Sequence, residues 1–178
     1  MQVIDKIILN FTNNKSLYIG EKVTMSEHMI QTAMLAEKAK CKDELICSCL
    51  LHDYGHFILE NPNELVKLKV DGHHENIGYE YLKVFFNKEV VQPIKYHVTA
   101  KRYLARNKEY FNLLSEASKT SLKLQGGVLN DEESSKFEAQ EYFKPSILLR
   151  KFDEAAKKTD IKMKSIHDYQ KLLTSNLI

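Results

Sequence analysis

Helical periodicity is the sequence feature that most restricts how this chain can fold. Apolar residues recur every three or four positions through three long stretches, MSEHMIQTAMLAEKA, HENIGYEYLKVFF and VVQPIKYHVTAKRYLA. Glycine and proline, the residues that most disfavour helix interiors, occur only six and three times in 178 residues. The sequence therefore predicts an almost entirely α-helical protein.

The breaks between these stretches predict where helices end within one domain. Turn and capping residues predict breaks at Asn13-Asn14, Asn61-Pro62, Asp71-Gly72, Gly126-Gly127 and before Pro145. The segment SLKLQGGVLNDEES is expected to be the least regular ordered part, its paired glycines forming either a plain loop or a close approach to a ligand. Because repeats and linkers are absent, residues 1–178 are expected to form one domain.

The charge balance argues against a macromolecular anion as partner. With 26 basic and 24 acidic residues and a net charge of +2, the chain lacks the positive field that recruits nucleic acid or a membrane surface. An anionic ligand should therefore be small and locally bound. No stretch approaches the roughly 20 apolar residues of a membrane span, and the first residues do not resemble a signal peptide. The sequence thus predicts a soluble, cytoplasmic protein.

The three cysteines are clustered but are not spaced for a metal or redox site. Cys41, Cys47 and Cys49 are odd in number and lack the C-x-x-C spacing. Free cysteine is commonly buried, so we expect small buried side chains in a reducing compartment.

The segment LHDYGH carries the strongest local signal for chemistry. His52 and Asp53 follow the apolar run LICSCLL, which places them at the end of a buried helix. A buried carboxylate without a partner is costly, so this pair needs an ion pair, a dense set of hydrogen bonds or a metal ion. Together the two residues offer one nitrogen and one or two oxygens, a set that suits iron, manganese or zinc.

Helical phase indicates which other histidines face the core. Three lie on the apolar faces of predicted helices: His28, His74 and His97. His73 is turned about 100 degrees away from its neighbour. The dipeptide His167-Asp168 lies in the polar segment SIHDYQKLL, so neither it nor His73 is expected to bind a metal.

The inward histidines gain significance from being together. Taken singly, each is more often a hydrogen-bonded core residue than a ligand. Combined with His52 and Asp53, they would leave many buried polar groups in one small domain, and metal coordination satisfies these groups together. Asp153, in SILLRKFDEAAKK, is either a further ligand or half of an ordinary helical ion pair with Arg150. The set predicts a buried metal site.

The ordered set of histidines and aspartates resembles the HD-domain superfamily, in which a helical bundle holds one or two metal ions. Most members are phosphohydrolases. The closer resemblance is to the mixed-valence diiron oxygenases related to myo-inositol oxygenase, and among them to the phosphonate-cleaving enzymes of the PhnZ type. The motifs that carry it span most of the chain: YIGEKVTMSEHMIQTA, LLHDYGHF, DGHHENIGYEYL, HVTAKRYL, SLKLQGG and LLRKFDEAAK. It implies an all-α, single-domain HD bundle.

The resemblance also implies a role for each ligand in a mixed-valence Fe(II)/Fe(III) pair. One iron would be held by His28, His52, Asp53 and Asp153. The other would be held by His74 and His97, with Asp53 bridging the two ions.

Tyr18 and Glu21 match the Y-x-G-E segment of the same family. The resemblance implies that Tyr18 occupies an iron position until the substrate displaces it, and that Glu21 receives the amino group of the substrate. Such a segment could act as a lid that closes on the right molecule. From the residues alone, a surface turn before a helix is the alternative.

Two cations are expected to face the substrate. Lys101 lies one helical turn after His97, and Arg150 lies one turn before Asp153, so each should project from a face that carries a ligand. An ammonium and a two-pronged guanidinium together suit a phosphonate or phosphate, whereas the alternative is that both neutralise ligand carboxylates. The resemblance implies three further substrate-side residues: His56, Ser121 and Gln125.

The activity that the resemblance implies is O2-dependent cleavage of the carbon–phosphorus bond of a 1-hydroxyphosphonate. The expected reaction converts 2-amino-1-hydroxyethylphosphonate to glycine and phosphate, with two iron ions, O2 as co-substrate and no organic cofactor. A metal-dependent phosphohydrolase acting on a nucleotide or phosphate ester is the alternative, because the same ligands could activate water. A non-catalytic binding module is a third reading. The sequence leaves open the methylation of the amine, the oligomeric state and the metal, since manganese or zinc would also fit.

Overall fold

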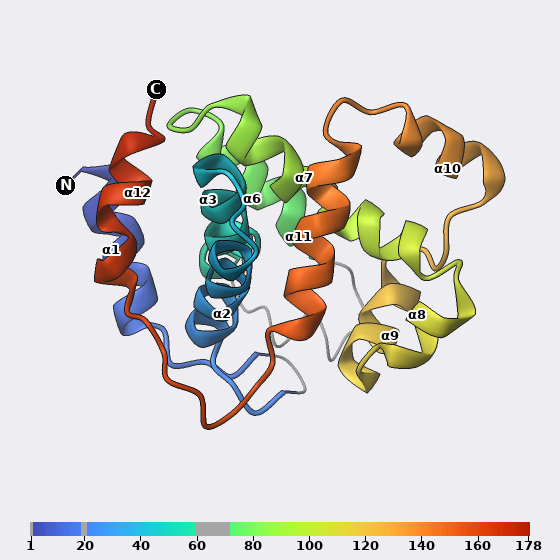
Figure 1. Cartoon of the computed structure of the whole chain (residues 1–178), viewed down its shortest axis with the longest axis horizontal. Helices are drawn as coiled ribbons and strands as arrows, with labels where there is room; N and C mark the ends of the chain where they lie inside the picture. Colours follow the sequence, from blue (N-terminus) through green and yellow to red (C-terminus); the bar gives the residue numbers. More distant parts are fainter. Residues whose placement is uncertain (1, 19–20, 60–71) are drawn as a thin grey trace.

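The main core of the computed structural model lies between helices α2 (Met25–Lys38), α3 (Asp43–Leu51), α7 (Lys88–Leu104) and α11 (Phe143–Ala155) (Figure 1). The structure describes residues 2–18, 21–59 and 72–178. The other described elements are α1 (Val3–Asn13), α4 (Gly55–Ile58), α6 (His74–Leu82), α8 (Lys108–Leu113), α9 (Glu116–Leu124), α10 (Asp131–Glu138), a 3-10 turn at Ile166–Tyr169 and α12 (Gln170–Ser175).

The prediction of an all-α fold is confirmed. In the described parts of the chain, extended pairing is limited to two isolated bridges, Leu17 with Thr24 and Phe86 with Leu177. The three stretches with helical periodicity form α2, α6 and α7. None of the described helices is long and apolar enough to cross a bilayer.

Most predicted breaks coincide with helix ends. Helix α1 ends at Asn13, and α11 begins two residues before Pro145, which falls in its first turn. Gly126 and Gly127 follow α9 with φ of +94° and +72°, the left-handed region that glycine adopts without strain. The predicted breaks at Asn61-Pro62 and Asp71 lie outside the described residues.

One expectation about regularity was wrong. The segment SLKLQGGVLNDEES is helical at both ends, because residues 121–124 belong to α9 and α10 begins at Asp131. Capping explains the difference. The Asn130 side chain accepts from the backbone N–H of Glu133, and the Glu133 carboxylate accepts from the backbone N–H of Asn130, so a helix starts immediately after the glycine turn.

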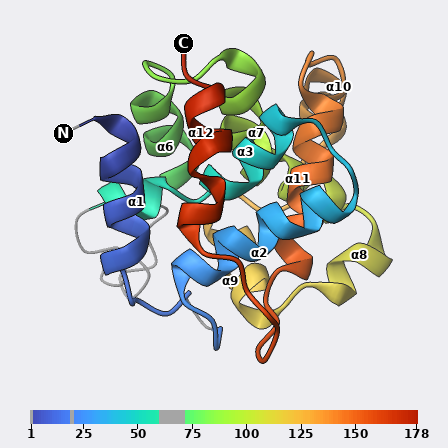
Figure 2. The same cartoon turned by 60° about the vertical axis from the view of Figure 1, so that its left-hand side comes forward.

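The core sits where α2 and α3 cross α7 and α11. The apolar run LICSCLL supplies fully buried Leu50, Leu51, Cys47 and Cys49 from α3. Figures 1 and 2 both show α1 beside α12 on one flank of this core. The burial predicted for cysteine is confirmed at these two positions but wrong for Cys41, which is partly exposed in the turn after α2.

A backbone contact between two glycines sets the spacing of α4 and α6. A Cβ built on Gly78 would lie 3.1 Å from the backbone nitrogen of Gly55, and one built on Gly55 would lie 1.9 Å from the carbonyl oxygen of His74. The two helices can approach this closely only without side chains at these positions. His74, at the start of α6, is thereby held near the segment that follows α3.

Replacing Gly55 with Ala should destabilise the fold far more than the same change at Gly78. The new methyl group would overlap backbone atoms that cannot swing aside, so we expect the free energy of unfolding to fall by about 3 kcal/mol for Gly55→Ala and about 1 kcal/mol for Gly78→Ala. Urea unfolding followed by circular dichroism measures both values. Equal losses would contradict the backbone contact.

Candidate metal centre

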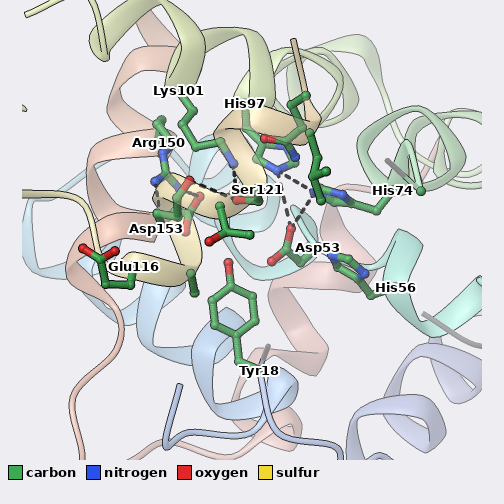
Figure 3. A pocket seen from close by; sticks show the side chains of 16 residues that line it. Tyr18, Asp53, His56, His74, His97, Lys101, Glu116, Ser121, Arg150 and Asp153 are labelled. Atoms are coloured by element: carbon green, nitrogen blue, oxygen red, sulfur yellow. Dashed lines mark hydrogen bonds and ion pairs between the residues drawn. The ribbon is translucent and has the colours of Figure 1, made fainter. Parts of the chain in front are cut away.

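Six buried side chains from five parts of the chain meet at the crossing of the core helices. His28 comes from α2, His97 from α7 and Asp153 from α11. His52 and Asp53 follow the last residue of α3, and His74 opens α6. Each is at most 8% exposed: His28, His52, Asp53, His74, His97 and Asp153. The structure thus brings together all six residues predicted as ligands (Figure 3 labels four of them).

The first cluster consists of His28, His52 and Asp153. The Nε2 atoms of His28 and His52 are 3.2 Å apart, and Oδ1 of Asp153 is 3.2 Å from Nε2 of His28. All three ligand atoms lie within 4.8 Å of one another. A single metal ion fits among atoms at this spacing, given that metal–nitrogen and metal–oxygen bonds are about 2.0–2.2 Å long.

The second cluster consists of His74, His97 and Asp53. The two Nε2 atoms are 3.1 Å apart, and Oδ1 of Asp53 lies 3.2 Å from His74 and 3.4 Å from His97. The other oxygen of Asp53, Oδ2, is 3.3 Å from Nε2 of His52. The Asp53 carboxylate therefore reaches both clusters with one oxygen each.

Hydrogen bonds on the far side of the rings fix which nitrogen faces the site. The Nδ1 atoms of His28, His52 and His97 donate to the backbone carbonyls of Ala156, Cys49 and Ile94 at 2.7–2.8 Å. Each Nε2 of a neutral ring then carries a lone pair directed at the cluster. The lone pairs of His28 and His52, on nitrogens 3.2 Å apart, repel unless a cation lies between them, and Oδ1 of Asp153 is also buried without a hydrogen-bond partner. This donor set fits two metal ions.

Both aspartates stay ionised in this environment. Burial raises the pKa of Asp53, but the neighbouring histidines outweigh it and hold that pKa well below its usual value. For Asp153 the charge of Arg150 and the contact with His28 likewise outweigh burial and lower the pKa. Two buried negative charges among histidine lone pairs form a strong cation site.

The residues that helical phase set aside lie away from the clusters. The side chain of His73 is 66% exposed, and its backbone has a φ of +47° immediately before α6. His167 and Asp168 are exposed in the 3-10 turn, where Asp168 accepts from the backbone N–H and hydroxyl of Ser165. The prediction that these residues do not bind the metal agrees with this geometry.

A cavity of about 400 Å³ opens next to the two clusters (Figure 3). Tyr18 forms part of its wall, and its ring stacks on His28 with centroids 4.0 Å apart. Burial, and then Asp53 and Asp153, raise the pKa of the Tyr18 phenol well above its usual value. The hydroxyl therefore keeps its proton unless a metal ion removes it.

His56 also lines the cavity, stacked on His74 with centroids 4.2 Å apart. Burial lowers its pKa, so the ring is neutral at physiological pH. Its Nδ1 atom is buried without a hydrogen-bond partner. His56 can thus exchange a hydrogen bond or proton with a bound molecule, as expected of a residue near the substrate.

Lys101 and Ser121, both predicted to face the substrate, border the cavity next to each other. The Nζ of Lys101 donates to Oγ of Ser121 at 3.0 Å, and no carboxylate among the described residues lies within ion-pair distance of this ammonium. Burial, and then Arg150, lower the pKa of Lys101 to about 7. Gln125 also borders the cavity, with its Oε1 buried and unpartnered. A small anion in the cavity would give the Lys101 ammonium a negatively charged partner.

Arg150 also borders the cavity, but its donors are largely engaged. Its guanidinium pairs with Asp153 and Glu154, and its Nε donates to the Tyr110 hydroxyl at 3.0 Å. The alternative considered for both cations, neutralisation of carboxylates, thus describes Arg150 and not Lys101. Arg150 holds the ligand Asp153 in place while its charge faces the cavity.

Glu21 is close to the site but does not border the cavity. Its Oε1 lies 3.4 Å from Nζ of Lys157, and its side chain is 16% exposed. The surrounding segment folds back on itself, because the N–H of Tyr18 donates to Val23 and the N–H of Glu21 donates to Tyr18. The Y-x-G-E segment thus ends beside α11, and the role expected for Glu21 stays a prediction.

Several site residues were missed in the sequence. Ser118 borders the cavity one helical turn before Ser121, and Glu154 binds Arg150. The spacing of four between Arg150 and Glu154 was the available signal, since it places opposite charges on one helix face. For Lys157, the spacing of three from Glu154 was the available signal, whereas its contacts with Ser115, Ser118 and Glu21 join other elements and gave none.

Metal content should depend more on Asp53 than on Asp153. Asp53→Asn removes an anionic oxygen from both clusters, whereas Asp153→Asn removes one from the first cluster alone. We expect Asp53→Asn to weaken binding at both clusters by more than the roughly tenfold to hundredfold typical of outer-shell changes. Elemental analysis of the protein after anaerobic loading with iron measures this, with the exposed Asp168→Asn as control. Equal metal loss in the two variants would count against a bridge.

Anion binding should weaken as Lys101 loses its proton. Sulfate keeps its charge from about pH 6 to about pH 9, so a fall in its affinity over this range reports on the protein. Because the free pKa of Lys101 is about 7, the ammonium becomes neutral as pH rises, and affinity should decline. Calorimetric titration of sulfate into wild type and, separately, into Lys101→Met isolates the contribution of Lys101. An unchanged pH profile in the variant would assign the decline to other groups.

Comparisons with known proteins agree with this geometry. A family model described as HD domain matches residues 25–134, a span that includes five of the six ligands and ends before Asp153. The [1-hydroxy-2-(trimethylamino)ethyl]phosphonate dioxygenase (glycine-betaine-forming) of Leisingera caerulea is 47% identical over 145 residues, which cover 81% of this chain and 74% of that protein.

Two further relatives match most of the chain. Hydroxymethylphosphonate dioxygenase of Gimesia maris is 41% identical over 154 residues, covering 85% of this chain and 77% of that protein. An uncharacterised protein of Acanthamoeba polyphaga mimivirus is 38% identical over 164 residues, covering 90% and 74%. The chain therefore belongs to the HD-domain family and, within it, to the family of the two phosphonate dioxygenases.

Proposed function

We propose that this protein is an O2-dependent diiron oxygenase that cleaves the carbon–phosphorus bond of a 1-hydroxyphosphonate. The observation that carries the proposal is the position of Lys101, a buried cation without a carboxylate partner among the described residues, in a cavity bordered by both metal clusters. The names of two relatives, both phosphonate dioxygenases, support the same chemistry.

The proposed reaction converts 2-amino-1-hydroxyethylphosphonate and O2 to glycine and phosphate. The substrates named for the two relatives share the 1-hydroxyphosphonate group and differ in the tail, which is a trimethylaminomethyl group in one and absent in the other. The shared group is therefore the part that the metals and Lys101 would bind. The protein would distinguish one 1-hydroxyphosphonate from another by its contacts with the tail.

The two metals, when bound, would supply Lewis acidity and electron transfer with O2 as the oxidant. His28, His52 and Asp153 would hold one ion and His74 and His97 the other, with Asp53 between them. The protein's own residues then position and neutralise the substrate. The Lys101 ammonium, with Ser121 as its neighbour, offsets the negative charge of the phosphonate.

Tyr18 and His56 complete the proposed site, one stacked on His28 and the other on His74. Tyr18 covers His28 and keeps water away from the first cluster until a substrate enters. His56, neutral and with a free Nδ1, can accept a hydrogen bond from the substrate's hydroxyl group. Both are proposed to act on substrate binding and on proton movement at the carbon that is oxidised.

Iron-loaded protein given 2-amino-1-hydroxyethylphosphonate should consume O2 and release phosphate and glycine in equal amounts. An oxygen electrode and a phosphate assay measure the two in one sample. Lys101→Met should lower kcat/KM by roughly a hundredfold, as expected for loss of a buried charged contact. Lys164→Met, which removes an exposed lysine remote from the site, is the matched control.

Two results would contradict the proposal. Release of phosphate from a nucleotide or phosphate ester without O2 uptake would identify a phosphohydrolase, which the same ligand geometry permits. Failure to consume O2 with any 1-hydroxyphosphonate, in protein that binds iron at both clusters, would exclude the oxygenase.

A further inference from the structure

Five side chains of alternating charge run from the metal centre to the Y-x-G-E segment. In order they are Asp153, Arg150, Glu154, Lys157 and Glu21, and each is paired with the next within 3.4 Å. The first four lie on one face of α11 and the turn after it, at spacings of three and four residues. This series connects the candidate ligand Asp153 to Glu21 in the Y-x-G-E segment.

The ammonium of Lys157 donates its hydrogens to Ser115, Ser118 and Glu154, and not to Glu21. Its Nζ is 3.1 Å from Oγ of Ser115, 2.9 Å from Oγ of Ser118 and 3.1 Å from Oε1 of Glu154. A lysine ammonium has three N–H donors, and these three acceptors satisfy them. Lys157 is thereby fixed against the start of α9, with a side chain only 10% exposed.

The contact between Lys157 and Glu21 is therefore one of charge. Oε1 of Glu21 lies 3.4 Å from Nζ, yet it has no hydrogen-bond partner and is buried. A carboxylate oxygen in this state is attracted to Lys157 while its capacity to accept a hydrogen bond stays unused. The same ammonium lies 5.8 Å from the centre of the Tyr18 ring, so it is close to both functional residues of the segment.

We propose that Lys157 is a positioning residue that holds Glu21 near the cavity, with Oε1 free to accept a hydrogen bond from a donor on the tail of the substrate. This inference rests on the proposed function and deepens it, because it assigns the recognition of the tail to a pair of residues. An ammonium tail would donate to Oε1 and complete its hydrogen bonding. A substrate without a tail would make no use of the pair.

Lys157→Met tests the inference, because methionine keeps an unbranched side chain and removes the charge. In iron-loaded, full-length protein we expect KM for 2-amino-1-hydroxyethylphosphonate to rise roughly tenfold, as for the loss of a partly buried charge contact. KM for hydroxymethylphosphonate, which has no tail, should change less than about twofold. Lys164→Met, which breaks the exposed pair with Glu37, is the matched control and should alter neither value.

Two further measurements separate positioning from a general structural effect. In a Glu21→Gln background, Lys157→Met should add little to KM for the amino substrate, because the two residues act together. Hydrogen–deuterium exchange of metal-free protein should be faster in Lys157→Met over residues 15–25, where the N–H of Tyr18 and the N–H of Glu21 are hydrogen-bonded.

Specific outcomes would overturn the inference. Equal changes in KM for both substrates, or full persistence of the effect in Glu21→Gln, would show that Lys157 does not act through Glu21. A wild type that turns over hydroxymethylphosphonate and rejects the amino substrate would refute the tail contact and leave the oxygenase intact. If neither phosphonate is consumed, the proposed function fails, and unchanged exchange over residues 15–25 would then also refute the positioning.

Discussion

The carboxylate of Asp53 is the interaction on which the rest of the site depends. One oxygen faces His52 and the other faces His74 and His97, so a single residue joins histidines from three parts of the chain. This arrangement requires close packing of α4 against α6. The contact between Gly55 and the carbonyl of His74 permits α6 to approach the segment after α3, and without it His74 would lie too far from Asp53.

The cavity beside the clusters is lined from α7 and α11, which also carry His97 and Asp153, and from α9, which carries no candidate ligand. Lys101 extends from α7 into the cavity next to Ser121 of α9, whereas Arg150 turns back to Asp153. The sequence predicted that both cations face the substrate, but the structure gives them different partners. Arg150 is paired with the carboxylate of Asp153, whereas Lys101 has no carboxylate partner among the described residues and is proposed to bind an anion. Lys157, which follows α11, connects the segment that carries Tyr18 to this network. It donates to Ser115 at the start of α9 and pairs with Glu21.

Much of the fold and the burial of His28, His74 and His97 were predictable, because helical phase depends on sequence spacing alone. For Asp153, spacing left an ordinary ion pair with Arg150 equally open, and only the family resemblance implied a place in the site. The period of 3.6 residues distinguished His74 from the exposed His73, and context distinguished His52-Asp53 from His167-Asp168. Contacts between distant segments could not be read in this way. The pairing of Lys157 with Glu21 spans elements whose packing no local pattern specifies. Likewise, the glycines and polar residues of 121–134 gave no indication that this segment contains the end of α9 and the capped start of α10.

The central claim is that Asp53 bridges two metal ions, and anomalous diffraction from crystals of iron-loaded protein tests it most directly. The account predicts two peaks at the iron absorption edge. One should lie between His28, His52 and Asp153 and the other between His74 and His97, each within about 2.0–2.4 Å of an oxygen of Asp53. A single peak, or two peaks of which one lacks contact with Asp53, would contradict the account.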